Sequence, residues 1–334
     1  MIKSHLNILR CPRTKSKLSL EILEEVKGRI KEGKLISENK VYTYPITNFI
    51  PRFVPPSNYA DNFGLQWNKF SKTQVDSFTK KTITFDRFWK ATGWNSKKME
   101  SKYVLDVGCG SGRFAEICLQ TNAIVIAIDF SSAVDAAYKN FGENENLFLI
   151  QADIYDLPFA ENTFPYIYSL GVLQHTPDVK KSFDSIVKLL QPGGYICVDY
   201  YWKRLMSVIH PKYVLRPLTK RMNKDKLFSI VKKILPGLLK VSNFLISIPI
   251  FGKFLSRFIP VANYKGTYDL SAAEQFEWSL LDTYDWFSPA YDNPQTISTV
   301  RRWCKDNDLV DIEIFHGGHL VARGKKPNLK VSLS

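Results

Sequence analysis

The segment LDVGCGSGRF, residues 105–114, restricts the fold of this chain more than any other stretch. It places Gly108, Gly110 and Gly112 at alternate positions directly after a short apolar run. A glycine-rich turn between a strand and a helix lets a ligand approach backbone N–H groups at the helix N-terminus, where the dipole is positive. The G-x-G-x-x-G spacing of dinucleotide-binding folds does not fit, because Arg113 stands where the third glycine is required. The pattern favours a ligand with a nucleoside and an amino-acid tail but no phosphate.

Residues 101–200 alternate short apolar runs with stretches of helical periodicity. Short strands separated by amphipathic helices are typical of βαβ units and a parallel sheet. The expected strands are KYVLDVG, AIVIAID, LFLIQAD, YIYSLGV and YICVDYY. The expected helices include residues 112–121, 131–141 and 179–190, where apolar side chains recur at steps of three and four. We therefore predict an α/β fold with a doubly wound sheet.

The C-terminal part adds a helix and a hairpin. The stretch NPQTISTVRRWCKDNDL predicts a helix, with Thr296 or Asn293 as its N-cap. The stretch DIEIFHGGHLVARGK predicts two strands joined by Gly317 and Gly318, which tolerate the positive φ of a hairpin turn.

Carboxylates stand at the ends of the first three expected strands. Asp106 precedes the glycine loop, Asp129 ends the second apolar run, and Asp153 ends the third. The carboxyl ends of parallel strands share one edge of a sheet, where ligands bind in the crevice outside the strands. There Asp129 can accept hydrogen bonds from both ribose hydroxyls, and Asp153 can accept one from an adenine amino group. The ordered set of three acids is stronger evidence for a nucleoside-binding site than the glycine loop alone.

Residues 101–200 resemble a class I S-adenosylmethionine-dependent methyltransferase of the ubiquinone/menaquinone-biosynthesis type. The motifs that carry the resemblance are VLDVGCGSGRF, AIDFSS, QADIYDLPF, SLGVLQHTPD and LLQPGGYICV. The resemblance implies a Rossmann-like, seven-stranded, mostly parallel sheet with the hairpin as its antiparallel end and a helical insertion. It also implies that S-adenosyl-L-methionine is the cofactor, bound by Asp106, Gly108, Gly110, Gly112, Asp129, Phe130, Ser131, Asp153, Ile154, Leu170 and Gly171.

Within that site, the resemblance assigns a place to each part of the cofactor. Gly108 and Gly110 would face the methionine part, and Asp129 would hold the ribose with Phe130 or Ser131 beside it. Asp153 and Ile154 would contact adenine. The remaining two positions, Leu170 and Gly171, would line the site under the sulfonium.

Residues 1–58 form a separate β-containing segment. Its stretches LNILRCPRTKSKLSLE and YPITNFIPRFVP resemble the small zinc-ribbon-like segment fused to some of these enzymes. Only Cys11 remains of the four cysteines that bind metal elsewhere, so we predict no metal site. The chain's five cysteines are widely spaced without a Cys-x-x-Cys pair, which indicates reduced thiols.

Two candidate elements near the cofactor leave alternatives open. His175 is either a general base beside the methyl acceptor or a loop histidine that only packs over the cofactor. The helix-spaced aromatic residues from Tyr59 to Phe70 are either core or a lid, with Gln66 and Trp67 as candidate contacts. We expect no metal at His316 and His319.

The net charge of +14 is concentrated in one segment. Residues 203–262 carry 13 Lys or Arg side chains and a single acid, Asp225. They lie in an insertion, residues 201–290, between two parts of the predicted methyltransferase domain, 59–200 and 291–325. In this insertion KLFSIVKKILPGLLK has a continuous apolar face. Three alternatives stay open: contact with an anionic membrane or capture of a lipid-linked or anionic substrate, a cap buried on the catalytic domain, and binding of nucleic acid, which is the weakest because no RNA module is present.

We predict an enzyme that transfers a methyl group to an O, N or C nucleophile of a small or lipid-like metabolite. The alternatives are an RNA methyltransferase and a non-catalytic partner protein that binds S-adenosylmethionine or its product. Residues 1–17 contain no apolar signal-peptide core, and no 18 consecutive residues are apolar. We therefore expect a cytoplasmic protein, with peripheral attachment to the inner face of the cytoplasmic membrane as an alternative. The accepting atom and the oligomeric state stay open.

Overall fold

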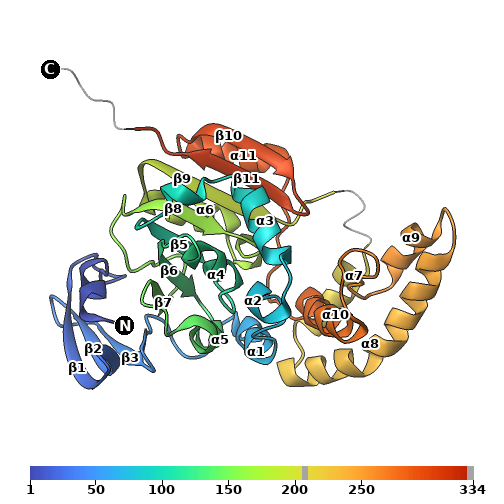
Figure 1. Ribbon diagram of the computed structural model, residues 1–334, viewed down its shortest axis with the longest axis horizontal. Coiled ribbons are helices and arrows are strands. Elements are labelled where there is room, and N and C mark those ends of the chain that lie inside the picture. The colour runs from blue at the N-terminus through green and yellow to red at the C-terminus, as the bar shows by residue number, and fades with distance from the viewer. Residues whose placement is uncertain (205–209, 329–334) are drawn as a thin grey trace.

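The computed structural model describes residues 1–204 and 210–328. Its centre is a seven-stranded sheet with the strand order β10-β11-β9-β8-β5-β6-β7 (Figure 1). The strands are β5 Tyr103–Val107, β6 Ile124–Asp129, β7 Leu147–Gln151, β8 Phe164–Ser169, β9 Leu190–Tyr200, β10 Val310–His316 and β11 Leu320–Lys325. Strands β5 to β9 pair in parallel, whereas β11 pairs antiparallel with both β9 and β10. The predicted α/β, doubly wound fold with its antiparallel end is confirmed.

The two faces of the sheet are covered by different helices. Val104 and Val125 lie on one face of the sheet, and Leu105 and Ile126 lie on the other face. The first face packs against α3 Ile83–Thr92, α4 Arg113–Leu119 and α5 Ala133–Phe141. The second packs against α6 Val179–Leu189 and α11 Ile297–Asp306. This two-sided burial explains why the central strands are continuous apolar runs without alternation.

Of the two candidate caps for α11, Thr296 is the one that the structure uses. Its hydroxyl accepts a hydrogen bond from the backbone N–H of Thr299 at 3.2 Å. The hairpin turn between β10 and β11 includes Gly317 and Gly318, and Gly318 has a positive φ of 88°.

The N-terminal segment forms its own four-stranded antiparallel sheet, shown in blue in Figure 1. The strands are β1 Leu18–Val26, β2 Arg29–Ser37, β3 Thr43–Thr47 and β4 Ile50–Pro51, after a 3-10 helix at Lys3–Asn7. This segment joins the edge of the central sheet at β7. The backbone N–H of Phe53 donates to the carbonyl of Gln151 at 2.8 Å, and Arg52 pairs with Asp135 at 2.6 Å. Its core is continuous with the core on one face of the central sheet.

The insertion is helical and lies on the other side of the molecule (Figure 1). Its helices are α7 Pro211–Thr219, α8 Lys224–Ser247, α9 Gly252–Leu255 and α10 Ala272–Phe287. The buried side of α8 packs with α10 in a core of their own, which Phe70 joins. Only Leu227, Val231 and Leu235 of the predicted apolar face are buried. No helix among the described residues is long and apolar enough to cross a membrane.

Two short helices lead from the N-terminal segment into α3. They are α1 Asp61–Lys69 and α2 Asp76–Thr79. Asn68 of α1 donates to the carbonyl of Ser132 at 3.0 Å, and Gly64 lets α1 approach the same residue closely, since an added Cβ would lie 2.3 Å from the Ser132 hydroxyl. The residue types at this contact therefore hold α1 over the carboxyl ends of β5 and β6.

Candidate active site

The glycine loop has a backbone that other residues cannot easily adopt. Gly108, Gly110 and Gly112 have φ angles of 83°, 55° and 86°. These angles lie in the left-handed region, which L-residues with a Cβ rarely occupy. A Cβ on Gly108 would also lie 2.4 Å from a methyl carbon of Val172. The alternation of glycines is thus a requirement of the turn, which starts α4 and exposes its N-terminus.

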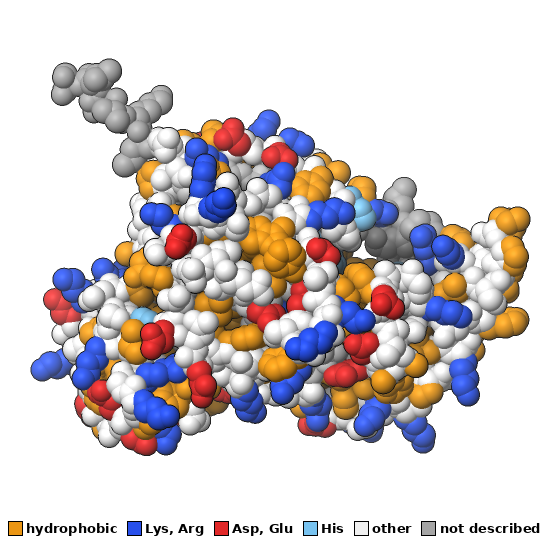
Figure 2. Space-filling view, in the orientation of Figure 1, with side chains coloured by type: hydrophobic (Ala, Val, Ile, Leu, Met, Phe, Trp, Pro, Cys, Tyr) orange, Lys and Arg blue, Asp and Glu red, His pale blue; other side chains and the backbone are white. Residues whose placement is uncertain are grey.

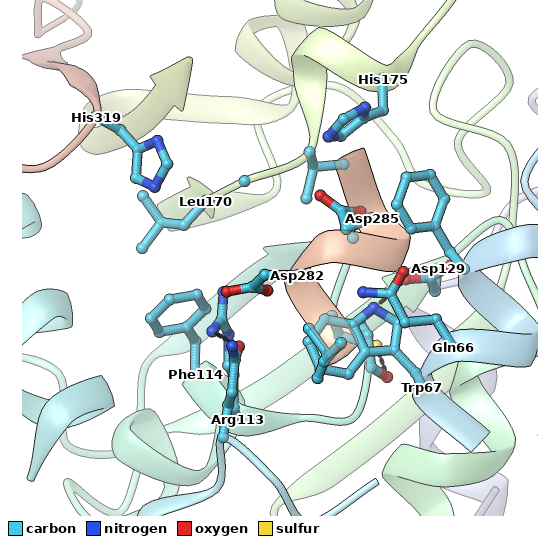
Figure 3. Close-up of a pocket in the computed structure, with 18 of the residues that line it drawn as sticks. Gln66, Trp67, Arg113, Phe114, Asp129, Leu170, His175, Asp282, Asp285 and His319 are labelled. Carbon is cyan, nitrogen blue, oxygen red and sulfur yellow. Dashed lines mark hydrogen bonds between the residues drawn. The ribbon is translucent and has the colours of Figure 1, made fainter. Parts of the chain in front are cut away.

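Asp129 is fixed beside this loop. One carboxylate oxygen accepts a hydrogen bond from the backbone N–H of Gly110 at 3.0 Å. The other accepts from the backbone N–H and the hydroxyl of Ser131, at 2.9 and 2.7 Å. Burial raises the pKa of Asp129 above its ordinary value, against the effect of these hydrogen bonds. The carboxylate is therefore held in one orientation, facing the cavity shown in Figure 3.

A cavity of about 560 Å³ opens along the carboxyl ends of the strands. Most of the cofactor contacts expected from the sequence line it, together with His175. These are Gly108, Gly110, Asp129, Phe130, Ile154, Leu170 and Gly171. The cavity therefore brings together residues that follow four different strands.

Four other expected residues do not line the cavity. Asp106 is buried behind the glycine loop, where burial raises its pKa to about 8. Gly112 packs toward Phe141, and Ser131 positions Asp129. The carboxylate of Asp153 accepts from the backbone N–H of Tyr155 at 2.9 Å, while its neighbours Ala152 and Ile154 line the cavity.

Helix α1 supplies a side of the cavity. Both candidate lid contacts, Gln66 and Trp67, line it (Figure 3). The side-chain oxygen of Gln66 is buried and accepts no hydrogen bond within the described residues. The indole of Trp67 lies against Gly110 and 5.7 Å from the guanidinium of Arg113. A buried acceptor without a partner is costly, so Gln66 points to a polar ligand at this place.

His175 has a defined orientation. Its Nδ1 lies 3.0 Å from the backbone carbonyl of Tyr291, and its ring lies against Phe63 and Tyr201. A carbonyl only accepts, so Nδ1 carries the hydrogen of the neutral ring and Nε2 keeps a free lone pair. Burial lowers the pKa of His175 below its ordinary value, which favours this neutral form.

The second wall of the cavity comes mainly from the insertion, and its individual residues are not among those expected from the sequence. Its residues are Tyr201, His210, Lys212, Tyr213, Tyr264, Tyr268, Trp278, Leu281, Asp282, Asp285 and Trp286. Figure 3 shows Asp282 and Asp285 on α10, with the side chain of Asp282 near Arg113. The only signal in the sequence is the spacing in WSLLDTYDW, which places Trp278, Asp282 and Asp285 on one helical face.

The acids of this wall are held by tyrosines. The hydroxyl of Tyr201 donates to Asp285 at 3.1 Å, and that of Tyr264 donates to Asp282. Burial raises the pKa of Asp282 to about 6. The ammonium of Lys212 pairs with buried Asp292 and lies 4.1 Å from the ring centre of Tyr201.

The opposite rim is formed by an ion pair and the hairpin. Arg87 pairs with Asp199 at 2.8 Å, and Asp199 also accepts from the backbone N–H of Gly171. His319 lines the cavity and stacks on Tyr201 with ring centres 5.5 Å apart. Burial, followed by the charge of Arg87, lowers the pKa of His319 to about 4. Within residues 1–204 and 210–328, no group of three His, Cys, Asp or Glu side chains could hold a metal ion.

These features fit S-adenosylmethionine. The glycine loop presents its backbone to the cavity, Asp129 offers a fixed carboxylate, and Gln66 offers an unpartnered oxygen. Apolar Ile154 and Leu170 line the same space. A ligand with polar groups at its two ends and a flat ring between apolar residues suits this lining.

Comparisons with known proteins agree. Residues 105–198 match the family described as methyltransferase domain, and residues 3–48 match that described as Trm112p-like protein. The ubiquinone biosynthesis O-methyltransferase of Coxiella burnetii is 30% identical over 128 residues, which are 36% of this chain and 55% of that protein. The sterol 24-C-methyltransferase of Pneumocystis carinii is 32% identical over 111 residues, 32% of this chain and 29% of that protein. The tRNA U34 carboxymethyltransferase of Pseudoalteromonas atlantica is 30% identical over 115 residues, 33% and 35% of the two chains.

The chain thus spans about half or less of the length of the curated relatives that it matches. Among solved structures, a putative S-adenosyl-L-methionine-dependent methyltransferase from Methanococcus maripaludis is similar, with a TM-score of 0.45 and 14% identity over 83% of this chain and 98% of that chain. The family matches, the glycine loop and the sheet topology together lead to one conclusion: the chain carries a class I S-adenosylmethionine-dependent methyltransferase domain behind a Trm112p-like segment.

Proposed function

We propose that this protein is an enzyme that transfers the methyl group of S-adenosylmethionine to an O, N or C nucleophile of a small or lipid-like metabolite. One observation carries the proposal. A single cavity joins the glycine loop and Asp129 to an aromatic and acidic wall, with His175 between them. The first end suits the cofactor, and the second has room and polar groups for an acceptor.

The residues at the cofactor end have distinct roles in this proposal. Asp129 accepts hydrogen bonds from ribose hydroxyls, and the backbone at Gly108 and Gly110 faces the methionine part. Ile154 packs on the adenine. The adenine amino group donates a hydrogen bond to the side-chain oxygen of Asp153 or Gln66. When bound, S-adenosylmethionine supplies a methyl group that its sulfonium already activates, so the protein mainly aligns the acceptor with it.

His175 acts as the general base if the acceptor is a hydroxyl or another protonated nucleophile. Its Nδ1 is fixed by the carbonyl of Tyr291, which leaves Nε2 to take a proton from an acceptor in the cavity. We expect His175→Gln to lower kcat by about 10²–10⁴-fold. Binding of S-adenosylhomocysteine should stay within about twofold, because Gln keeps a polar side chain of similar reach. An unchanged kcat would leave His175 only a packing role.

The acceptor is proposed from the second wall and from the insertion that supplies it. Rings of Tyr264, Tyr268 and Trp278 pack on one another there, beside Asp282. Such a wall suits an organic acceptor with an apolar or ring-shaped body. In this proposal the basic part of the insertion, residues 203–262, contacts an anionic membrane at the inner face of the cytoplasmic membrane. An RNA acceptor is less well supported, because the exposed side chains beside these cations are largely apolar.

Calorimetry with S-adenosylhomocysteine tests the cofactor end. The parent protein should bind it, and Asp129→Ala should weaken binding by about 10–100-fold, the value of a hydrogen bond to a charged group. Asp282→Asn is the matched control in the opposite wall and should bind as the parent does. No heat with the parent protein, or equal binding by Asp129→Ala, would contradict the proposal.

Turnover tests the second half of the proposal. Cell extract supplied with S-adenosylmethionine and the protein should release S-adenosylhomocysteine. Pretreatment of the extract with RNase should leave the release unchanged, whereas extraction of lipids and small metabolites should abolish it. Loss after RNase would favour the RNA alternative, and binding without release would favour a non-catalytic partner protein.

A further inference from the structure

Helix α8 carries more apolar surface than its packing uses. Its buried side chains Leu227, Val231 and Leu235 face α10. A second set of large apolar side chains along the same helix is exposed. This set is Ile230, Ile234, Val241 and Phe244, and exposed Ile248 follows as the C-cap residue. The spacing of the exposed set by three, four or seven residues gives α8 a second apolar stripe, which no described element covers.

The stripe continues into the end of the insertion. The chain turns there between α8 and α9, in the part of the molecule at the right of Figure 1. Ile250 is 91% exposed and Phe251 is 67% exposed. Ile250 has a positive φ of 66°, which a β-branched residue rarely adopts, and this turn directs it away from the protein. Further exposed apolar side chains follow at Phe254, Leu255 and Phe258. We call residues 248–258 the apolar tip.

Positive charge lies along α8 and in the apolar tip, where Lys253 and Arg257 are exposed. No acidic residue occurs from residue 226 to residue 268. The exposed cations of this stretch are Lys226, Lys232, Lys233, Lys240, Lys253, Arg257 and Lys265. None of them forms an ion pair with any residue in the described part of the chain. Figure 2 shows apolar and basic side chains side by side at this edge of the molecule.

This combination selects the partner. A nucleic acid would use the cations but would offer nothing to Ile250 and Phe251. A second copy of the chain would cover the apolar side chains but would bring cations against cations. An anionic bilayer satisfies both sets, because apolar side chains enter the boundary of headgroups and acyl chains while lysines meet the lipid phosphates.

We propose that the apolar tip enters the surface of an anionic membrane, with Ile250 and Phe251 as its deepest residues. Binding to the membrane does not depend on methyl transfer. Its consequence rests on the proposed function: α10 packs on α8 and also lines the cavity, so attachment of the tip brings the acceptor end of the cavity near the lipid.

Sedimentation with lipid vesicles tests the proposal. The full chain should bind phosphatidylglycerol vesicles at low ionic strength, bind phosphatidylcholine vesicles weakly, and lose affinity as salt is added. Ile250→Asp/Phe251→Asp should weaken binding by about tenfold or more, because both side chains leave the lipid. Lys253→Gln/Arg257→Gln should weaken it by about fivefold per cation removed.

The matched control changes two other exposed apolar residues far from the tip. Leu23 and Val41 in the N-terminal segment are 60% and 68% exposed, and Leu23→Asp/Val41→Asp should bind vesicles about as the parent does. Binding of S-adenosylhomocysteine by every variant shows that the fold and the cofactor site are intact. Equal vesicle binding by the tip variant and the parent would overturn the proposal.

Other outcomes separate this proposal from the proposed function. A parent chain that binds S-adenosylhomocysteine but no anionic vesicles refutes the membrane contact and leaves the methyltransferase proposal standing. A lipid-free dimer that Ile250→Asp/Phe251→Asp dissociates would overturn the membrane assignment in favour of self-association. Tighter binding to single-stranded RNA than to vesicles at the same salt would overturn it in favour of nucleic acid.

Discussion

The N-terminal segment and the insertion are both additions to one sheet, yet they attach to it in opposite ways. The N-terminal segment merges with the edge at β7 through backbone hydrogen bonds, the Arg52–Asp135 pair and a shared core. The insertion keeps a core of its own between α8 and α10, lines the cavity and leaves the apolar tip exposed. The difference teaches that the first addition shares the core of the sheet, whereas the second lines the cavity and leaves large apolar side chains exposed.

A matched pair of leucines gives the largest expected effect. Leu35 in the N-terminal segment and Leu235 in α8 are both fully buried. Replacing either with Ala removes packing and leaves a cavity, which costs about 2–5 kcal/mol. Leu35→Ala should lower the free energy of unfolding of the whole sheet, because its core is continuous with the sheet's core. Leu235→Ala should mainly speed hydrogen exchange in α8 and α10.

Urea unfolding and hydrogen exchange together measure this difference. In Leu35→Ala, exchange should rise in β6 and β7 as well as in β1 to β4. In Leu235→Ala, exchange in β6 and β7 should stay as in the parent. If Leu35→Ala loosens only β1 to β4, the N-terminal segment is an independent unit and the contrast between the two additions fails.

The ion pair at the sheet edge gives a smaller effect. Arg52 donates to Asp135 at 2.6 Å and to the side chain of Gln151 at 2.8 Å, with both partners only partly exposed. Arg52→Ala should lower the free energy of unfolding by about 1–2 kcal/mol. A hydrogen bond to a charged group contributes less here than in a fully buried site, because solvent screens the partly exposed charges.

The control for Arg52 is the exposed pair of Arg13 and Asp156, 3.0 Å apart. Arg13→Ala should change the free energy of unfolding by less than about 0.5 kcal/mol. The same urea titration measures both variants. Equal losses for the two would show that the segment is held by its apolar core and not by the Arg52 contacts.

How far the sequence predicts this molecule also differs between regions. The glycine loop is visible in the sequence because three residues need a positive φ, a property of the local backbone. The strands are visible because burial on both faces makes them continuous apolar runs. The expected place of Asp129 at a strand end follows from the same pattern. These features depend on residue type and on the order of residues along the chain, so the sequence alone predicts them.

The second wall of the cavity could not be predicted in this way. Tyr201, Tyr264 and Asp282 meet only because α10 folds back over the strand ends. Residue type does not tell that the carboxylate of Asp153 accepts from the backbone N–H of Tyr155 instead of lining the cavity. It also does not tell which side chains of α8 are buried. The periodicity of α8 gives one broad apolar face, and tertiary packing decides that Leu227 is covered while Ile230 is exposed.

A pair of buried carboxylates, Asp282 in the insertion and Asp199 in β9 of the central sheet, gives an effect that depends on pH. Burial raises the pKa of Asp282 from 3.8 in the unfolded chain to about 6. The folded protein therefore holds a proton that the unfolded chain has lost, so this group's contribution to stability falls as pH rises from about 4 to about 6. Asp199 behaves in the opposite sense: although burial opposes it, the charge of Arg87 lowers the pKa of Asp199. Its contribution is present above the ordinary pKa and is lost as pH falls.

Asn substitutions at the two positions should give slopes of opposite sign. Relative to the parent, Asp282→Asn should become more stable between about pH 4 and pH 6 and stay level above that range. Asp199→Asn should be less stable than the parent near neutral pH, with a difference that shrinks as the pH falls below the ordinary range of Asp. Urea unfolding from pH 2 to pH 8 checks both. Parallel curves would mean that the insertion does not bury Asp282 in solution, so that the second wall of the cavity is looser than the sheet that it covers.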